Sequence, residues 1–574
     1  MIIGIDLGTT NSLAAYFNNE SNEPVLIPNV YGDFLTPSVV SVDANGDMLV
    51  GKIARERLLS HPQETVGVFK RSMGTKKEYL LGERKFLPEE LSAILIKRLK
   101  EDAEIFLGKT VTEAVVSVPA YFNDAQRRAT KAAGTLAGLT VERIVNEPTC
   151  AAIAYGLHER EDYTKFLVFD LGGGTFDVSI LEKYKNVMEV RAVAGDNFLG
   201  GEDFTNVIVN YFSTKTKLDI SELSSHEMAR VIKGAEAAKI GLSHSKSVTM
   251  KLVFDNEEDD DDESAFEYSL DITSSQYERQ CESLFAALRH PIKRALNDAN
   301  MKLTDIDNVL LVGGATKMPL VRSFVSKVFG RIPASHIDPD VVVAMGSAVH
   351  AALKARDKSL KEVVLTDVCP YSMGTEVAIQ RPNGLFDPGH YAPIIERNSV
   401  VPVSRSEKFY TLNDNQTQIT SKILQGENRR AADNILLGEI SVPVTPGPAG
   451  QESIDIRFTY DINGILEAEV TVLSTGEKQS LVIEKSPGAL TPQELEDKLK
   501  AMREIKIHPR DKEEFRFILA WGERLYEESK GDLRKYLEQE LQNLDTLLDE
   551  QDERRLRDYC QHLKEVFSDI EKDF

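Results

Sequence analysis

Hydrophobic and polar residues follow different periods in successive parts of the chain. Up to about residue 355, apolar runs of strand length alternate with segments whose apolar positions recur at helical spacing. Helices are predicted near 88–107, 124–137, 202–217, 226–241, 274–299 and 318–329, and strands near 2–7, 114–118, 166–169 and 309–312. Strands that alternate with helices in this way predict an α/β architecture.

After this part the pattern changes twice. Residues 368–488 are rich in β-branched residues, proline and glycine and alternate strictly in places, which predicts an antiparallel β-sandwich. From Thr491 the charge density and spacing of apolar residues predict a short helical bundle or lid, with Thr491-Pro492-Gln493-Glu494 as a capping start. We therefore predict an α/β domain at 1–358, a linker at 359–367, a β-sandwich at 368–488 and a helical lid at 489–574.

Composition narrows the classes of function. The net charge of −23 disfavours a nucleic-acid partner, because contacts with phosphate need a basic surface. The four cysteines are scattered without CxxC spacing, which favours a reducing compartment. A strand that begins at Ile2 and the lack of a bilayer-length apolar run predict a cytoplasmic protein without a membrane partner. The acidic run at 257–263 lacks calcium-loop spacing and is interpreted as a solvated hairpin tip.

One pattern occurs twice, an apolar strand that ends in aspartate and runs directly into a turn of glycine and threonine. The copies are Ile2–Thr10 and Phe166–Thr175, and each continues into a second apolar strand. Glycines let the backbone approach a ligand, while N–H groups and threonine hydroxyls favour an anion. Each copy predicts a hairpin whose turn grips phosphate, with Asp6 and Asp170 near a divalent metal. A single copy would be an ordinary glycine turn, and the duplication favours the phosphate site.

Several short segments form a further set, at residues 3–12, 118–127, 146–149, 170–177, 200–204, 311–314 and 424–434. Together they resemble the 70-kilodalton heat-shock (DnaK-like) chaperone family across nearly the whole chain. The resemblance implies an actin-like α/β two-lobed ATPase domain, an all-β peptide-binding sandwich and a short α-helical lid. The short length makes the chain similar to a specialised, HscC-like bacterial member. The implied activity is ATP hydrolysis that switches the affinity for extended apolar segments of unfolded or specific client proteins.

The same resemblance implies a site for ATP or ADP with Mg²⁺, and K⁺ is a further candidate ion. Lys70 matches the lysine that positions the attacking water, and Glu147, Asp177 and Thr175 complete the polar ring around it. Asp6 and Asp170 match positions that orient Mg²⁺ through its water shell. Without the motifs, Lys70 would be interpreted as a surface charge and Glu147 as a helix start. Implied nucleotide contacts are Gly8, Thr9, Thr10, Asn11, Gly172, Gly173, Gly174, Thr175, Gly200, Gly201, Glu202, Glu236, Lys239, Ser243, Gly313, Gly314 and Asp340.

The sandwich residues matched to the peptide groove are Phe409, Leu412, Ile419 and Ile423. Their spacing alone favours an ordinary sandwich core. Leu412 and Ile419 are larger than the residues usual in the family, so we expect a narrow groove and a narrow range of clients. The segment 379–386 is an insertion near the groove whose contacts stay unassigned.

Coupling between the two sites needs an element that both can bias. The apolar stretch 363–365 of the linker is the candidate, docked on the ATPase domain in one state and released in the other. Pro119, Arg127, Lys131 and Asp367 match residues that transmit this change, and Arg143 matches the arginine that docks a J-domain co-chaperone. Alternatively, Arg127 and Lys131 form the basic face of a solvated helix.

Two departures from the family concern nucleotide exchange. Ile240 replaces an arginine that stacks over adenine, which removes on the order of 1 kcal/mol and predicts weaker nucleotide affinity. The segment 72–86 is short, which leaves open whether a standard exchange factor is used.

Two other classes of function share the twin hairpins. A sugar or acid kinase would also need an acceptor pocket with a catalytic base, and an actin-like filament protein would need only the two lobes. Neither class explains the β and helical parts that follow residue 368. ATP turnover without any acceptor, stimulated by unfolded peptide, would separate the three.

Overall fold

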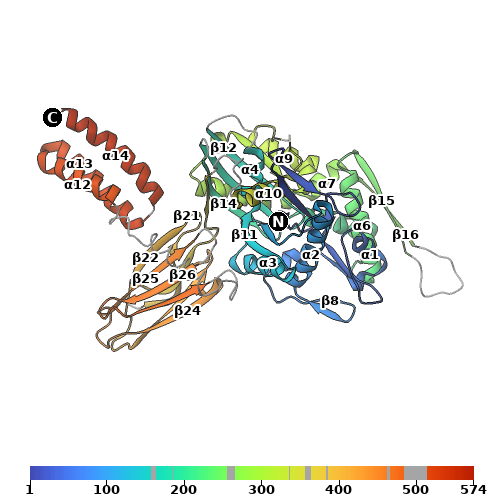
Figure 1. Ribbon diagram of the computed structural model, residues 1–574, viewed down its shortest axis with the longest axis horizontal. Helices are drawn as coiled ribbons and strands as arrows, with labels where there is room; N and C mark the ends of the chain where they lie inside the picture. The colour runs from blue at the N-terminus through green and yellow to red at the C-terminus, as the bar shows by residue number, and fades with distance from the viewer. Residues whose placement is uncertain are drawn as a thin grey trace. The chain divides into compact units, whose positions relative to one another are not determined.

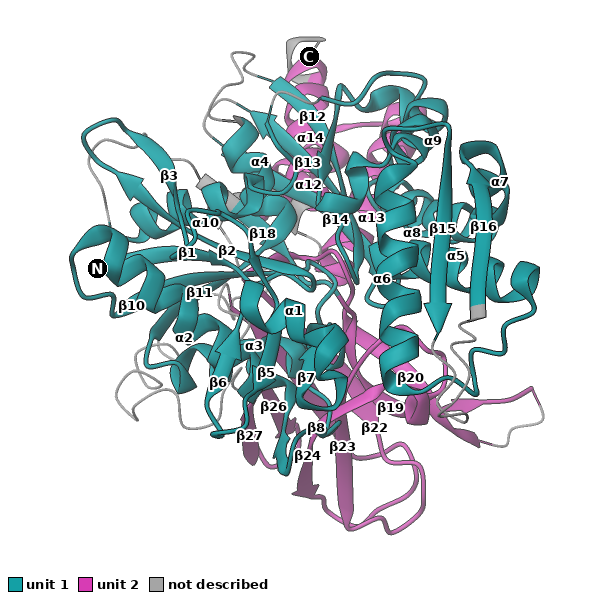
Figure 2. Ribbon diagram, turned by 90° about the vertical axis from the view of Figure 1, so that its right-hand side faces the viewer, with its two compact units in different colours: residues 1–370 teal, residues 371–574 magenta. Residues whose placement is uncertain are grey.

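The chain folds into two compact units, residues 1–370 and 371–574 (Figure 2). The structure, a computed structural model, describes residues 1–156, 163–184, 187–254, 266–334, 337–355, 364–382, 386–461, 466–483, 513–551 and 553–573. The predicted capping start at Thr491, the acidic run 257–263 and residues 383–385 of the predicted insertion lie outside these ranges.

The first unit is an α/β structure. Its strands are β1 (Ile2–Asp6), β2 (Asn11–Asn18), β3 (Glu23–Ile27), β4 (Thr36–Pro37), β5 (Val39–Val42), β6 (Met48–Val50), β7 (Thr65–Gly67), β8 (Tyr79–Leu81), β9 (Arg84–Phe86), β10 (Glu113–Val118), β11 (Thr140–Asn146), β12 (Tyr163–Leu171), β13 (Phe176–Tyr184), β14 (Val187–Asp196), β15 (Ser247–Phe254), β16 (Phe266–Thr273), β17 (Asn308–Val312) and β18 (Val364–Val368). Its helices are α1 (Lys52–Ser60), α2 (Pro88–Leu107), α3 (Asp124–Leu136), α4 (Glu147–Gly156), α5 (Gly201–Thr216), α6 (Ser225–Gly241), α7 (Ser274–Gln280), α8 (Glu282–Asp298), α9 (Pro319–Phe329) and α10 (Val342–Lys354).

Two mixed sheets of this unit repeat one topology. Figure 1 labels β11 of the first sheet and β12 and β14 of the second. In the first, β1 pairs antiparallel with β2 and parallel with β10, and β3 follows antiparallel to β2. In the second, β12 pairs antiparallel with β13 and parallel with β17, and β14 follows antiparallel to β13. The predicted duplication of a half-domain is therefore confirmed, and each copy places its glycine turn at the end of a central strand.

The central strands are apolar on both faces because both faces are covered. Ile3 and Ile5 of β1 and Leu167 and Phe169 of β12 are fully buried. A separate hydrophobic core surrounds each sheet, one around the first and one around the second. Strands that are covered on both sides have continuous apolar sequences, which explains why β1 and β12 could be identified from the sequence.

Helices α4 and α10 cross with their backbones in contact. A Cβ added at Gly346 of α10 would lie 2.0 Å from the carbonyl oxygen of Cys150 on α4, so only glycine fits there. Helix α10 also packs against β1 and β2, while α4 packs against β12 and β13. This crossing ties the two sheets to one another and fixes how their turns are placed.

The predicted helices of this unit are confirmed within about one residue, with one correction. The helix predicted over 274–299 is divided at Cys281 into α7 and α8. The short segment 72–86 forms only the small hairpin of β8 and β9 before α2 begins.

The apolar end of the predicted linker is a strand. Residues 364–366 of β18 pair in parallel with Val187, Met188 and Glu189 of β14. Residues 356–363 lie outside the described ranges.

The second unit combines a β-sandwich with a helical bundle. One sheet has the order β20-β19-β23-β24 and the other β22-β25-β26-β27, and the predicted alternation at 454–460 and 466–472 forms the paired strands β25 and β26. Within the described residues that follow, α12, α13 and α14 share a core that includes Phe515, Leu544 and Phe567. The elements are β19 (Met373–Gln380), β20 (Phe386–Ile395), β21 (Val400–Val401), β22 (Val403–Tyr410), β23 (Gln418–Gln425), β24 (Ile435–Pro443), β25 (Ser453–Tyr460), β26 (Leu466–Val472), β27 (Lys478–Ile483), α12 (Glu513–Glu528), α13 (Gly531–Glu550) and α14 (Glu553–Asp573).

Candidate functional site

A cavity of about 400 Å³ is lined by the turns of both repeated hairpins. Gly8, Thr9 and Thr10 come from the turn after β1, and Gly173 and Thr175 come from the turn after β12. The two turns lie directly against each other, since a Cβ added at Gly173 would be 1.8 Å from the Thr10 hydroxyl oxygen. The duplicated pattern therefore converges on one site.

Local hydrogen bonds hold the first turn open. The Gly8 N–H donates to Ser12 Oγ at 3.1 Å, and Ser38 Oγ donates to the Gly8 carbonyl at 2.8 Å. The hydroxyl of Thr10 is buried and has no hydrogen-bond partner within the described part of the chain. A buried hydroxyl in this position is available to a ligand, and a phosphate oxygen would satisfy it.

Most residues that were matched to nucleotide contacts line this cavity. Three predicted residues do not: Gly174 and Gly200 pack behind the second turn, and Asp177 lies buried beyond it. Lining residues that sequence reasoning missed include Leu35, His244, Val312, Met318 and Pro339. The predicted residues in the lining are Asp6, Gly8, Thr9, Thr10, Asn11, Lys70, Glu147, Asp170, Gly172, Gly173, Thr175, Gly201, Glu202, Glu236, Lys239, Ser243, Gly313, Gly314 and Asp340.

Lys70 is not a surface charge. Its residue is only 3% exposed, and its amine donates to Glu147 Oε1 at 2.9 Å in a buried ion pair. A short 3-10 helix, Phe69–Ser72, presents Lys70 to the cavity. Val68 directly before it has a φ of 59°, which a β-branched residue rarely adopts. Backbone strain of this kind concentrates at functional sites and adds a signal that the sequence did not carry.

Negative charge exceeds positive charge around this lysine. Burial and the charge of Glu147 raise the pKa of Asp6 to about 7 and that of Asp177 to about 8, although Lys70 lowers both. Burial also raises the pKa of Asp170 well above its ordinary range. One carboxylate oxygen each of Asp170 and Asp177 is buried without a hydrogen-bond partner among the described residues. A cation would relieve both the repulsion and the missing contacts.

Mg²⁺ fits this arrangement. In the described ranges, no group of three or more histidine, cysteine or acidic side chains is placed to ligate a metal directly. Asp6 and Asp170 line the cavity beside both turns, where they could bind a hydrated ion through its water molecules. The pair would hold Mg²⁺ next to bound phosphates.

The raised pKa of Asp177 predicts a measurable dependence of stability on pH. An unfolded aspartate titrates near 4 and this buried one near 8, so over that window the folded state retains a proton that the unfolded state has lost. The free energy of unfolding therefore falls as the pH rises, by up to about 1.4 kcal/mol per pH unit. Asp177→Asn keeps the size and removes this titration.

We expect the melting temperature of the ligand-free Asp177→Asn variant to fall less than that of the unmodified chain between about pH 5 and about pH 7. Calorimetry at several pH values measures it. Asp219→Asn, at an exposed aspartate, is the control and should leave the slope unchanged. Equal slopes for the Asp177 variant and the unmodified chain would show that Asp177 does not titrate in this range.

Arg71 joins the two halves of the site. Its Nε donates to the Gly174 carbonyl at 3.0 Å, and its guanidinium pairs with Asp203 at 2.5 Å. The same Asp203 carboxylate accepts the N–H of Gly200 at 2.8 Å. Arg71 therefore links the segment that carries Lys70 to the second turn. Sequence reasoning missed this role because the bonded residues are far apart in the chain.

A polar wall of the cavity is built on α6. Lys239 pairs with Glu236 at 2.6 Å and donates to the hydroxyl of Thr205 at 2.8 Å, and Thr205 in turn donates to Glu236. Ile240 also lines the cavity and is 49% exposed, as expected for a position that could cover a base. Lys317, which follows β17 and also lines the cavity, forms ion pairs with Asp338 at 2.9 Å and Asp340 at 2.5 Å.

Comparison with known proteins gives one consistent result. The family model described as Hsp70 protein matches residues 2–80 and 76–573. The curated "Chaperone protein DnaK" of Thermosipho melanesiensis is 41% identical over 489 residues, which covers 84% of this chain and 80% of that protein. The same protein of Thermosipho africanus is 41% identical over 489 residues, covering 84% and 79%.

The chain belongs to the Hsp70 protein family. Membership confirms the resemblance seen in the sequence and with it the multidomain fold of an ATP-binding, heat-shock type chaperone. Similarity to the HscC-like subtype stays a prediction. None of the helices in the described ranges has the length and apolar character needed to cross a bilayer.

Residues matched to coupling in the Hsp70 family form a connected set in part. Arg127 is 6% exposed and donates to the carbonyls of Phe122 and Ala120, each at 3.0 Å, and to Asn146 Oδ1 at 2.6 Å. Asn146 Nδ2 donates to Asp367 Oδ2 of β18 at 2.7 Å. The alternative of a solvated basic face is therefore wrong for Arg127.

Other residues matched to Hsp70 coupling lie nearby in the fold. Pro119 is buried directly after β10, Lys131 lies one turn beyond Arg127 on α3, and Arg143 lies on β11. Sequence reasoning missed Asn146, which bridges the set and precedes Glu147 in the chain.

Residues matched to the Hsp70 peptide groove come from both sheets of the sandwich. Phe409 lies on β22, Leu412 follows that strand, and Ile419 and Ile423 lie on β23. Leu412 is 39% exposed, whereas Ile423 is 1% exposed. Tyr410, next to Phe409 in the chain, is 58% exposed and adds an accessible aromatic side chain to this set.

Proposed function

We propose that this Hsp70 chain is an ATP-dependent molecular chaperone that binds extended apolar segments of unfolded or specific client proteins. Hydrolysis of ATP to ADP and phosphate, followed by exchange, would switch its peptide affinity through the linker. The observation that carries this proposal is the cavity between the two repeated turns, with the buried Lys70–Glu147 pair at its wall. The DnaK relatives named above are chaperones by description.

The residues of the site divide the work of hydrolysis. Backbone N–H groups of both turns, with the hydroxyls of Thr10 and Thr175, hold phosphate oxygens. Lys70 orients the attacking water, and Glu147 fixes the lysine by their hydrogen bond. Asp177 completes the polar ring around this site; because its pKa is raised to about 8, it carries a proton near neutral pH and would accept the proton of that water only where a bound cation lowers its pKa. Mg²⁺ bound beside Asp6 and Asp170 supplies positive charge that offsets the phosphates, and K⁺ is a further candidate ion.

Peptide would bind where apolar side chains of the sandwich remain accessible. Leu412 and Tyr410 lie at the end of β22 and are exposed, which supports them as groove walls. Ile419 is half-buried on β23 and supports the floor, and Ile423 backs it from the core. Accessible apolar surface rimmed by polar strands is the kind of surface that takes an extended apolar segment.

The proposal also covers partner proteins and cellular location. A J-domain co-chaperone would dock near Arg143, which is partly exposed on β11. The reduced hairpin of β8 and β9 leaves the use of a standard exchange factor open. A cytoplasmic location, with no nucleic-acid or membrane partner, completes the proposal, and four buried free cysteines support a reducing compartment.

Ile419 provides the test of peptide binding. Ile419→Phe should fill the groove and lower the affinity for apolar peptides by about tenfold or more, because overpacking costs about 1–3 kcal/mol. Ile419→Val should admit bulkier peptides at a stability cost of about 0.5–1.5 kcal/mol. Fluorescence anisotropy with labelled peptides and peptide-stimulated ATP turnover without any acceptor measure both.

Thr420→Phe is the matched control, since Thr420 is exposed and neighbouring residues of a strand point to opposite faces. It should bind peptides like the unmodified chain. Identical peptide profiles for both Ile419 variants would show that Ile419 is plain sandwich core. ATP turnover that requires a phosphoryl acceptor and ignores peptide would instead favour a kinase.

A further inference from the structure

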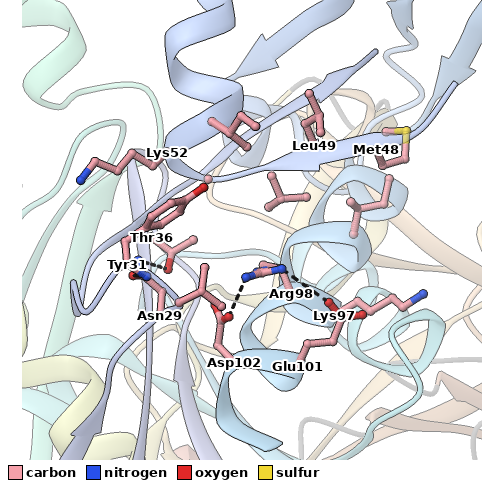
Figure 3. Close-up of a pocket in the computed structure, with 15 residues that line it drawn as sticks. Asn29, Tyr31, Thr36, Met48, Leu49, Lys52, Lys97, Arg98, Glu101 and Asp102 are labelled. Atoms are coloured by element: carbon pink, nitrogen blue, oxygen red, sulfur yellow. Dashed lines mark hydrogen bonds and ion pairs between the residues drawn. The ribbon is translucent and has the colours of Figure 1, made fainter. Parts of the chain in front are cut away.

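A second cavity, of about 310 Å³, lies within the first unit (Figure 3). It is bounded by the loop 29–36 that follows β3, by β6 with the start of α1, and by one face of α2. Its lining shares no residue with the nucleotide cavity. Neither the family motifs nor the proposed function uses any of its side chains.

The two cavities share a wall. Asn29 lines the second cavity, and its amide donates to the Leu35 carbonyl at 3.4 Å and the Thr36 hydroxyl at 3.3 Å. Leu35 lines the nucleotide cavity, whereas Thr36 lines the second one. The Asn29 side chain also accepts the N–H groups of Tyr31 and Asp33, at 3.0 and 3.1 Å. One amide thus organises the whole loop between the cavities.

The same wall is bonded directly to the first phosphate turn. Two residues after Thr36, the Ser38 N–H donates to the Thr10 carbonyl at 2.9 Å, and Ser38 Oγ donates to the Gly8 carbonyl at 2.8 Å. Strand β4 between them pairs with β2 at Asn11 and Ser12. A change in the position of the loop 29–36 would therefore be transmitted to Gly8 and Thr10 over one short, hydrogen-bonded segment.

The side chains of the second cavity have a definite chemistry. Arg98 extends into it from α2, and its guanidinium pairs with Asp102 at 2.9 Å (Figure 3). The Asp102 side chain is 3% exposed and the Arg98 side chain 31%, so the carboxylate is buried while the cation remains accessible. Glu101 is a weaker partner, at 4.0 Å. Glu101 is also exposed, but the cations Lys52, Lys97 and Arg98 outnumber the carboxylates Glu101 and Asp102 in the lining, so the cavity has a net positive charge.

The rest of the lining is partly aromatic and apolar. Tyr31 is 54% exposed, and the amine of Lys52 lies 5.5 Å from the centroid of its ring. Met48, Val50 and Ile94 complete the apolar surface. An aromatic face, an apolar wall and accessible cations together suit a planar apolar body that carries an acidic group.

We propose that this cavity is an effector site for a small organic anion with a planar apolar body, and that its occupancy is coupled to nucleotide binding through the segment 29–38. The acidic group would contact Arg98, and the planar body would stack on Tyr31. An occupant that orders Tyr31 and Asn29 also orders Leu35 and Ser38, so the first turn holds its phosphate longer. The coupling rests on the proposed nucleotide function, whereas the binding does not.

The test uses the full chain saturated with Mg²⁺ and ADP, and the probe anilinonaphthalene sulfonate, an aromatic anion of the proposed class. Fluorescence titration should show that Tyr31→Ala and Arg98→Gln each weaken probe binding by about tenfold. Tyr31 is exposed, so its variant keeps the test valid if loss of the Arg98–Asp102 pair impairs folding. Arg55→Ala removes an exposed charge from α1 outside the cavity and should bind the probe normally.

By linkage, saturating probe should slow ADP dissociation by about fivefold in the unmodified chain and not in Tyr31→Ala. If all three variants titrate like the unmodified chain, the probe binds elsewhere and the site is refuted. If Tyr31→Ala loses the probe but ADP dissociation in the unmodified chain is unchanged, the coupling is refuted and the site stands. If the chain fails to bind ADP, the proposed function fails, and titration of the ligand-free variants still decides the cavity.

Discussion

Lys70→Ala is expected to lower the rate of ATP hydrolysis by at least about 100-fold while ATP affinity changes by less than about tenfold. The amine acts on the attacking water, and the phosphates are held chiefly by the two turns. Removing it also leaves Glu147 buried beside Asp6, Asp170 and Asp177 without their cation. The ligand-free variant should therefore melt at a lower temperature, and Mg²⁺ with ADP should restore part of that loss.

Single-turnover hydrolysis and calorimetric ATP titration separate these effects. Glu147→Gln serves as the matched variant, because it keeps a hydrogen-bond acceptor for Lys70 and removes one charge. It should retain more activity than Lys70→Ala. Near-normal single-turnover hydrolysis in Lys70→Ala would show that another group orients the water.

Asn146→Ala is expected to uncouple the two units. In the unmodified chain, we expect ATP to weaken peptide binding by a factor between about 5 and about 150, the usual range of allosteric coupling. Asn146 is the residue through which Arg127 and Asp367 are joined, so its loss should reduce that factor to near one. Basal hydrolysis should persist, because the Lys70–Glu147 pair does not involve the Asn146 side chain.

Peptide affinity in ATP and in ADP measures the effect, with Asn45→Ala on an exposed loop as the control. Asp367→Ala breaks the same hydrogen bond, so the double variant should be no more uncoupled than either single variant. Additive losses would mean that Asn146 and Asp367 act through separate routes. A full ATP response in Asn146→Ala would remove this contact from the coupling.

The sequence was most informative where structure is encoded locally. In each copy of the repeated pattern, a buried strand, a glycine turn and a second strand lie within a few residues of one another. On that basis the sequence predicted that Asp6 and Asp170, the corresponding residues of the two copies, lie at the site. The buried central strands of both sheets could be predicted for the same reason, since strands covered on both faces are continuously apolar. Local periodicity could not show that the helix predicted over 274–299 divides at Cys281.

Contacts between distant residues escaped sequence reasoning. The Arg71 bond to Gly174 spans 103 positions and the Asn146 bond to Asp367 spans 221, and neither side chain carries a local signal for its partner. The second cavity is assembled from a loop, a strand and two helices, each ordinary by itself. Only the three-dimensional arrangement brings Tyr31 and Arg98 into the lining of one cavity.

The short pairing of β18 with β14 affects how fast β18 can detach from its sheet. Only the backbone of residues 364–366 is in register with that strand, whereas β12 and β13 pair along their whole length. Segments with so few hydrogen bonds open by local unfolding at a small fraction of the global free energy. Such opening typically takes microseconds to seconds, so detachment of this strand need not wait for any disruption of the cores and can keep pace with a turnover cycle.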